Sequence, residues 1–288
     1  MAVPFVYIIF SRYFSAALHC KPKFKIMNGD AKDKIDEIIQ NGYDFRFGDY
    51  ISKGFSLFQK NIGGFIIYAV VTLVLIMVIN FIPIIGALVS NFILTPILTV
   101  GAYIVAHKLD KREQTAFGDF FKGFDHIGPL ALTALATFVI MMLSLIPFFM
   151  VVSSSGLIAW YMDVLQNPMS MSGVSIPSIP GWSFLLLLPA VYFAVAYNWA
   201  YMFVVFYKMS FWDAMESSRK VISKNWMIIF LFLFVSGLIA AAGIIVLCVG
   251  ILVTFPAYLC MNYSAFAGVT QLGTESEESD NIENHLVD

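Results

Sequence analysis

Charged residues are scarce in this sequence. Only 12% of the chain is Asp, Glu, Lys or Arg, whereas 59% is hydrophobic, and an average soluble domain carries about 25% charged residues. The windows 62–79, 130–152 and 227–249 contain none of these four residue types. Because so few charges cannot cover so much apolar surface in water, the composition excludes an ordinary soluble globular protein.

The uncharged windows are long enough to cross a lipid bilayer. A helix needs roughly 20 mainly apolar residues to span the hydrocarbon core. This criterion predicts an all-α fold: a polytopic membrane protein whose six transmembrane helices form hairpins. The predicted spans are 62–82, 85–106, 129–152, 183–206, 226–247 and 251–270.

Basic residues are missing from every second connection. All 17 Lys and Arg residues lie before the first span, between spans two and three, or between spans four and five. Because cationic loops stay on the cytoplasmic side of a membrane, this distribution predicts a multi-pass protein with both termini in the cytoplasm.

Cysteine is also rare, and its positions predict no disulfide framework. Cys20, Cys248 and Cys260 are the three cysteines of the chain, and we interpret them as free thiols. Near the N-terminus an apolar run comes before the lysines, the reverse of a secretory signal. We interpret 1–26 as an upstream extension before a natural start at Met27, with an interfacial anchor or a signal as alternatives.

Charged side chains that could take part in catalysis or proton transfer are missing from the predicted spans. These hold no Asp, Glu, Lys or Arg, and the four histidines are scattered. Intramembrane enzymes and proton-coupled transporters keep such groups at depth despite their cost, and no phosphate-binding or metalloprotease motif is present. The sequence therefore predicts no enzyme, cofactor, metal site or nucleic-acid partner. Copper at Met169 and Met171 is a weak alternative, because no Cys or His accompanies them.

Aromatic residues are abundant and recur at helical spacing outside the spans. In 47–60 they form one stripe, with serines and lysines largely off it. Such a helix rests at the headgroup boundary, with its rings towards lipid and its lysines towards water. We predict three cytoplasmic interfacial helices, marked by Phe47, Asp49, Phe55, Phe117, Asp119, Phe121, Phe211 and Asp213.

The same residues indicate an internal repeat. Phe47-Gly48-Asp49 leads after ten residues to Lys60-Asn61 and a span, and Phe211-Trp212-Asp213 leads after ten residues to Lys224-Asn225 and another span. Phe117-Gly118-Asp119 begins a shortened copy. Chance matching of common interfacial residues is the alternative. The repeat predicts three units, each an interfacial helix and a membrane hairpin, at 47–107, 117–207 and 211–270.

Uncharged polar residues gather at two places in the spans. Asn91 and Thr95 lie one turn apart on the second span. Tyr197, Asn198 and Tyr201 lie on neighbouring faces of the fourth. Both groups could line a polar path, and interhelical hydrogen bonding is the alternative interpretation.

Small residues in the fifth span predict close helix packing. Ser236 and Ala240 have the spacing that lets helix backbones approach, as do Gly237 and Ala241. A ligand groove is the alternative.

The segments outside the spans complete the predicted domain organisation. Within the long external connection 153–181, residues 156–166 could form one more amphipathic helix. The tail has acidic residues, no basic residue and few apolar groups, so it has little reason to fold. The predicted regions are 1–26 (extension or anchor), 27–61 (cytoplasmic amphipathic helices), 62–270 (six-helix transmembrane domain) and 271–288 (disordered acidic cytoplasmic tail).

Several motifs resemble a recurrent pattern of bacterial membrane proteins. One is Thr95–Tyr103, followed by the charged turn 108–113 and Phe117-Gly118-Asp119. The other is 211–215, followed by Lys224-Asn225-Trp226 and 250–256. Over 46–270 the chain is similar to uncharacterised six-helix families that are called permease-like, and to the membrane domain attached to some glycerophosphodiester phosphodiesterases. The resemblance implies an all-helical fold in a bacterial inner membrane, and it transfers no active-site residue.

Two classes of function follow from these predictions. The first is a permease-like or lipid-interacting role, with a polar cavity and basic loops that touch anionic lipid headgroups. The alternative is a structural or assembly scaffold that docks cytoplasmic or membrane protein partners. A continuous cavity would favour the first class, and a dry core sealed by packing at Gly237 and Ala241 would favour the second.

Overall fold

The computed structural model describes residues 29–166, 177–245 and 250–272. Across these ranges the chain is all-α and contains no strand. Six helices are long and apolar enough to cross a membrane, which confirms the predicted multi-pass fold. They are Ile62–Asn80, Ile85–Asp110, Phe117–Ser154, Gly181–Phe206, Trp226–Ile244 and Ile251–Thr270. The predictions for 1–26, Met27, Cys20, Cys248, the two methionines and the acidic tail lie outside the described residues.

The order of the helices follows the predicted repeat. After α2 (Gly29–Asn41), the first unit has the interfacial helix α3 (Phe47–Lys60) and the span α4 (Ile62–Asn80). Its second span joins α5 (Ile85–Val89), the π-helix η1 (Ser90–Leu94) and α6 (Thr95–Asp110). Because α6 continues past the predicted end at 106, its last turn carries His107, Lys108 and Asp110.

The second and third units repeat this order. The second has the 3₁₀ helix η2 (Phe117–His126), the span α7 (Ile127–Ser154), and a return through η4 (Gly181–Leu187), α9 (Leu188–Ala196) and α10 (Ala200–Phe206). The amphipathic helix expected at 156–166 is α8 (Leu157–Gln166). The third unit has α11 (Phe211–Lys224), α12 (Trp226–Ile245) and α13 (Ile251–Thr270).

The aspartate repeated in each interfacial helix lies in its first turn. Asp119 accepts a 2.9 Å hydrogen bond from the backbone N–H of Ala116, and Asp213 accepts a 2.6 Å bond from the Ser210 hydroxyl. Asp49 lies at the same place in α3, 4.0 Å from Arg46. An acidic side chain here satisfies or orders the helix start and complements the helix dipole. The repeated motif therefore begins a helix.

In each unit the second span lies in the interior of the helix bundle, and the first span lies at its periphery. In their most apolar stretches, the second spans are 56%, 33% and 61% buried, whereas the first spans are 11%, 0% and 22% buried. The inner helices are thus α6, α9–α10 and α13, and the outer helices are α4, α7 and α12. The outer helices face lipid over most of their length.

Equivalent positions anchor each outer helix to the interior. Four residues after Asn61, His126 and Asn225 come three side chains with 0% exposure: Phe65, Leu130 and Ile229. Three residues further on come Tyr68, Thr133 and Phe232, exposed by 4%, 0% and 0%. This shared pattern of burial supports the three-unit repeat in structure as well as in sequence.

Each interfacial helix packs on the inner helix of the preceding unit. η2 lies on α6, α11 on α10, and α3 on α13, so the last unit closes onto the first. Glycines permit two of these approaches: Gly123 lies against the Ile97 carbonyl, and Gly54 lies against the Met261 backbone. We call α3, η2 and α11 the interfacial ring.

The burial of α3 differs from the prediction that its aromatic face rests on lipid. Tyr50, Gly54, Leu57 and Phe58 are buried, because this face packs on α13. Phe55 remains 46% exposed. Only part of the aromatic stripe therefore faces the membrane, and protein covers the rest.

Small residues join α12 to α13 through one of the two expected pairs. Ser236 is fully buried, and the Thr254 hydroxyl donates a 2.8 Å bond to the Ala240 carbonyl. Gly237 has no atom within 4 Å of where a Cβ would be, and Ala241 is exposed. The contact face is thus Ser236, Ala240 and Gly243, and the expectation for Gly237 and Ala241 is wrong.

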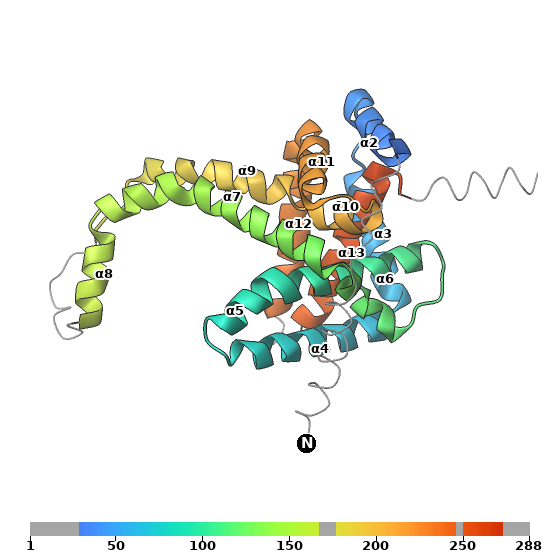
Figure 1. Cartoon of the computed structure of the whole chain (residues 1–288), viewed down its shortest axis with the longest axis horizontal. Helices are drawn as coiled ribbons and strands as arrows, with labels where there is room; N and C mark the ends of the chain where they lie inside the picture. The colour runs from blue at the N-terminus through green and yellow to red at the C-terminus, as the bar shows by residue number, and fades with distance from the viewer. Residues whose placement is uncertain (1–28, 167–176, 246–249, 273–288) are drawn as a thin grey trace, which may run out of the picture.

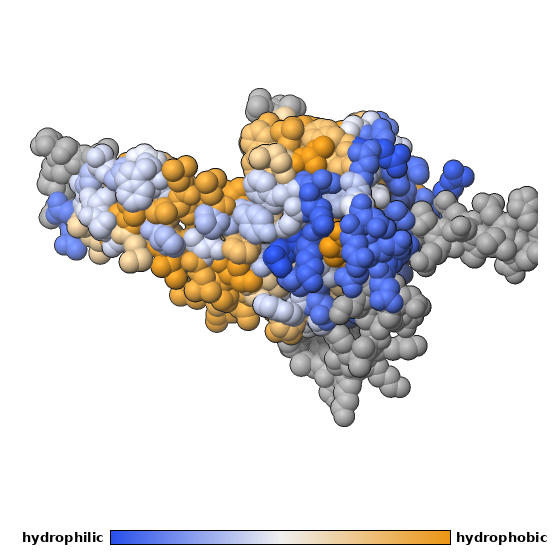
Figure 2. All heavy atoms as spheres, turned by 90° about the horizontal axis from the view of Figure 1, so that it is seen from above, coloured by the Kyte–Doolittle hydropathy of each residue, from blue (hydrophilic) through white to orange (hydrophobic). Residues whose placement is uncertain are grey.

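The hairpins diverge from the end that carries the interfacial ring. The hairpin of α7 and α9 extends furthest, with α8 beyond it (Figure 1). Hydrophilic residues gather at the end away from α8, and hydrophobic side chains cover the middle of the molecule (Figure 2). A bilayer therefore surrounds the spans, with the interfacial ring at one boundary.

Candidate functional site

A chain of buried hydrogen bonds joins the three inner helices. The Trp199 indole N–H donates a 3.0 Å bond to Oδ1 of Asn262. The amide Nδ2 of Asn262 then donates a 3.0 Å bond to the Tyr103 hydroxyl. These residues come from the α9–α10 junction, α13 and α6, and each is at most 3% exposed. Buried polar groups with satisfied partners fix the register of the helices they join.

Trp199 reaches this position because the fourth span is broken. α9 ends at Ala196 and α10 begins at Ala200, so the intervening turn releases backbone carbonyls from the helix. The Ser218 hydroxyl of α11 donates a 2.7 Å bond to the carbonyl of Ala196. Ser218 occupies the place in α11 that Gly54 has in α3. The hydroxyl of Ser218 gives a hydrogen-bond partner to a carbonyl freed by the helix break, whereas Gly54 permits the close approach of α3 to α13.

A second polar chain lies one turn closer to the interfacial ring. Nδ1 of His107 and the Tyr263 hydroxyl are 2.8 Å apart, and that hydroxyl donates a 3.3 Å bond to Asp110. Lys53 of α3 completes the chain at 2.8 Å from Asp110. Since His107 follows Tyr103 by one helical turn and Tyr263 follows Asn262, the two chains occupy successive levels of the α6–α13 contact.

Asp119 ties η2 to the end of α6. Its carboxylate lies 2.9 Å from Lys108 and 2.7 Å from Lys122. The side chain is nearly buried, with a residue exposure of 5%. Two ammonium groups and one backbone N–H therefore offset the cost of removing this carboxylate from water. Asp49 and Asp213 are exposed, so only one of the three repeated aspartates joins two elements through an ion pair.

The five residues proposed to line a polar path lie in different surroundings. Asn91 is exposed and donates to the Ala87 carbonyl of its own helix at 2.8 Å, and Thr95 is also exposed. Tyr197, stacked on Phe193 at 5.6 Å, and Tyr201 are half-buried. Oδ1 of Asn198 is buried without a hydrogen-bond partner among the described residues. The path itself stays a prediction.

Each helix of the interfacial ring carries one exposed aromatic side chain. Phe55 is 46% exposed in α3, Phe117 is 43% exposed in η2, and Trp212 is 60% exposed in α11. Phe47, Phe121 and Phe211 are half-buried. Phe120 is 1% exposed and stacks on Tyr68 at 4.4 Å. Each helix thus offers a ring that can enter lipid, and α3 and η2 also carry rings that pack inward.

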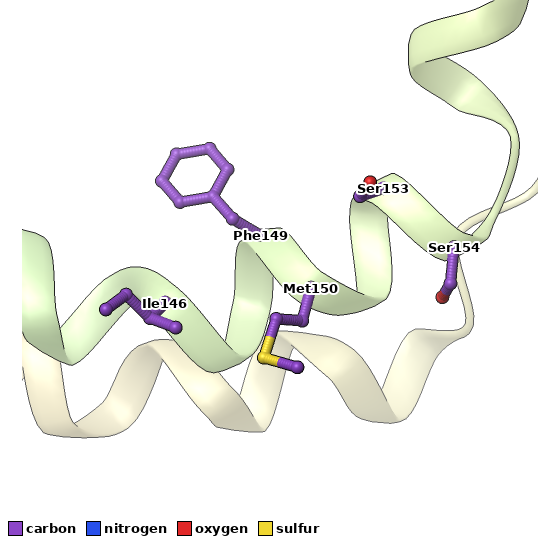
Figure 3. Close-up of a pocket in the computed structure, with 5 residues that line it drawn as sticks. All are labelled: Ile146, Phe149, Met150, Ser153 and Ser154. Carbon is purple, nitrogen blue, oxygen red and sulfur yellow. The ribbon is translucent and has the colours of Figure 1, made fainter.

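One hollow in the surface lies far from these polar chains. Ile146, Phe149, Met150, Ser153 and Ser154 line it, and all five belong to the outer half of α7 (Figure 3). Phe149 points away from the neighbouring ribbon (Figure 3), so the five side chains do not converge on one point. Within the described ranges, no group of three His, Cys, Asp or Glu side chains could hold a metal.

The residues that join the inner helices were not among the predicted site residues. Trp199, Asn262 and Tyr103 lie on three different spans, and sequence spacing does not show which helix faces which. One sign was available: Asn262 is a lone amide in an apolar span, and such a group needs a partner in a membrane.

Comparison with protein-family models, curated proteins and solved structures finds no match to this chain. The length and apolar composition of its six long helices therefore identify the chain as an all-α, multi-pass membrane protein in contact with a lipid bilayer.

Proposed function

We propose that the protein is a non-catalytic membrane platform, which holds other proteins at the membrane surface beside its interfacial ring. Filled packing between the three inner helices carries this proposal. Trp199, Phe203, Tyr263 and Phe266 are all 0% exposed. Any solute that crossed along the axis between these helices would have to displace them and break the Trp199–Asn262 bond. Rigid packing of this kind suits a protein that holds partner proteins in place at the membrane.

The platform faces the cytoplasm of a bacterium in this proposal, and its membrane is the inner one. In the sequence every basic residue comes before the first span or in the connections that hold η2 and α11, as the rule for cationic loops requires of a cytoplasmic face. The resemblance to six-helix bacterial families supports the same membrane. Partners would meet the exposed polar faces of α2, α3 and α11.

Cysteine accessibility tests whether the interior is sealed. In a chain whose three cysteines are replaced by alanine, Asn198→Cys and Tyr201→Cys should resist a membrane-impermeant thiol reagent applied to either side. Ser154→Cys and Asp213→Cys, both at exposed positions, are matched controls that should react from opposite sides. Labelling of either interior cysteine would contradict the platform.

A second experiment tests for a partner. A photo-cross-linking residue in place of Asp49 or Asp213, which are exposed on the interfacial ring, should form a discrete protein adduct in intact cells. The same residue in place of Phe81, 83% exposed at the other end of α4, is the control and should contact lipid. Failure of every ring position to give an adduct would contradict docking there.

A permease-like role is the second candidate, because of the break in the fourth span. Transporters often place substrates at interrupted helices, where freed backbone and polar side chains bind them. Oδ1 of Asn198 lies in this break without a partner among the described residues. Reaction of Asn198→Cys from one side, together with solute flux in liposomes, would favour this role.

A further inference from the structure

One face of α11 carries polar and charged side chains next to α9. Glu216, Arg219, Lys220 and Ser223 share the face at helical spacing. Nε and Nη2 of Arg219 donate bonds of 2.9 and 2.7 Å to the Glu216 carboxylate. The Ser223 hydroxyl lies 2.8 Å from the hydroxyl of Tyr192 in α9. We call these five residues, with Trp226 at the start of α12, the α11 corner.

The α11 corner has an excess of positive charge. Lys220 lies 3.5 Å from the same carboxylate oxygen that binds Arg219. Because Arg219 lies beside Glu216, it holds the pKa of that carboxyl below its usual range, and the group remains ionised at neutral pH. Two cations against one carboxylate leave one net positive charge, at side chains that are 36–48% exposed. An anion can therefore approach them.

A column of aromatic rings runs from the α11 corner along α12. Tyr192 stacks on Trp226 at 6.1 Å, Trp226 on Phe230 at 5.3 Å, and Phe230 on Phe234 at 6.2 Å. The last ring is 54% exposed. The indole nitrogen of Trp226 is buried without a hydrogen-bond partner among the described residues. The column thus joins an unpartnered donor at the membrane boundary to an open apolar surface within the bilayer.

The other two units show that the fold does not require these residues. At the places of Arg219 and Lys220, the first unit has Phe55 and Ser56. In place of Trp226, Phe230 and Phe234, the first unit has Ile62, Ile66 and Val70, and the second has Ile127, Ala131 and Leu135. By contrast, all three units keep apolar or hydroxyl-bearing side chains at the two buried anchor positions. The cations and the ring column are therefore additions to the repeat.

We propose that the α11 corner binds an anionic phospholipid from the leaflet next to the interfacial ring. The phosphate takes charge-assisted hydrogen bonds from Arg219 and Lys220, and the Trp226 ring lies at the start of the aromatic column. An acyl chain lies along Phe230 and Phe234. A lipid fits better than a soluble phosphate, because the column continues from the cations into the apolar surface. The inference does not depend on the platform role.

The binding test uses the full chain purified in detergent and native mass spectrometry. Phosphatidylglycerol should stay bound through activation that removes phosphatidylcholine with the same acyl chains. The triple variant Glu216→Gln, Arg219→Gln, Lys220→Gln should weaken retention of phosphatidylglycerol by about fivefold, since it removes one net positive charge and each such charge near an anionic surface contributes about 1 kcal/mol. Trp226→Leu should also weaken it. Arg46→Gln is the matched control, because Arg46 is a 68% exposed cation at the N-cap of α3 and is paired at i,i+3 with Asp49.

Three results would overturn the proposal. One is equal retention of phosphatidylglycerol by the wild type and the triple variant, and another is an equal loss in Arg46→Gln. The third is competition by inorganic phosphate at the concentration of the lipid, which would indicate a soluble anion instead. A diazirine-bearing phosphatidylglycerol tests the unaltered protein, so no variant needs to fold. It should label 226–234, and labelling spread evenly over the outer helices would contradict the site.

Discussion

Gly54 of α3 lies directly against the backbone of Met261 in α13. A Cβ added at position 54 would lie 2.5 Å from the Met261 nitrogen, and nearer still to its Cα. Gly123 and Ile97 make the same kind of approach between η2 and α6. Two of the three contacts that close the interfacial ring therefore depend on the absence of a side chain.

Gly54→Ala is expected to destabilise the protein. The added methyl group meets backbone, which cannot move aside as a flexible side chain can, so we expect a loss of about 2 kcal/mol in the free energy of unfolding. Gly48→Ala in the same helix is the control, because no atom lies within 4 Å of its Cβ position. It should be neutral or stabilising. Unfolding in mixed micelles measures both, and equal stability of the two variants would contradict the close approach.

Asp119→Asn tests the ion pair between α6 and η2. The change removes the negative charge that faces Lys108 and Lys122, and it should cost about 2 kcal/mol of stability. Asp213→Asn removes an exposed carboxylate from the same helix position and should cost less than about 0.5 kcal/mol. Thermal unfolding of the two proteins in one detergent distinguishes them. Similar melting temperatures would show that burial of Asp119 has no energetic consequence.

Asn262→Leu tests the hydrogen-bond chain between the inner helices. It leaves the Trp199 indole and the Tyr103 hydroxyl without their shared partner, and at about 1 kcal/mol for each lost bond it should cost about 2 kcal/mol. Asn91→Leu is the control, since Asn91 is exposed and bonds only within its own turn. Unfolding in mixed micelles should separate the two variants, and a stable Asn262→Leu protein would refute the role of the chain.

Arg112→Gly should stabilise the protein. Arg112 has a φ of 58°, and Lys208 and Gln271 have φ values of 51° at the ends of the other two inner helices. A side chain in this left-handed region costs about 1 kcal/mol relative to glycine, so removing it should raise the unfolding temperature. Gly42→Ala, at a φ of 74°, is the converse and should lower it. A fall in both would mean that the Arg112 side chain makes a compensating contact.

Local patterns in the sequence were sufficient for the spans and the repeat. Uncharged windows locate each span because the bilayer acts on one helix at a time, and Phe211-Trp212-Asp213 indicated α11 because helix starts depend on neighbouring residues. The π-helix at 90–94 lay within a predicted span, but its extra residue per turn leaves no clear pattern in hydropathy.

Contacts between spans were harder to predict. Ser236 and Gly237 are adjacent and both small, yet only Ser236 faces α13, because the rotation of α12 is set by the helices around it. The Trp199–Asn262–Tyr103 chain likewise depends on how three hairpins meet. Each of these residues alone fits an ordinary apolar or interfacial position, so the sequence did not indicate that they form hydrogen bonds with one another.

The closure of α3 onto α13 has a consequence for synthesis. The ribosome makes α3 roughly 200 residues before its partner, which at about 5–20 residues per second is a delay of about 10–40 s. During that interval the α13 surface that covers Tyr50 and Gly54 does not yet exist, and the membrane surface is the apolar medium within reach. The first helix of the ring is therefore one of the last to find its final neighbours, and lipid acts as its temporary partner.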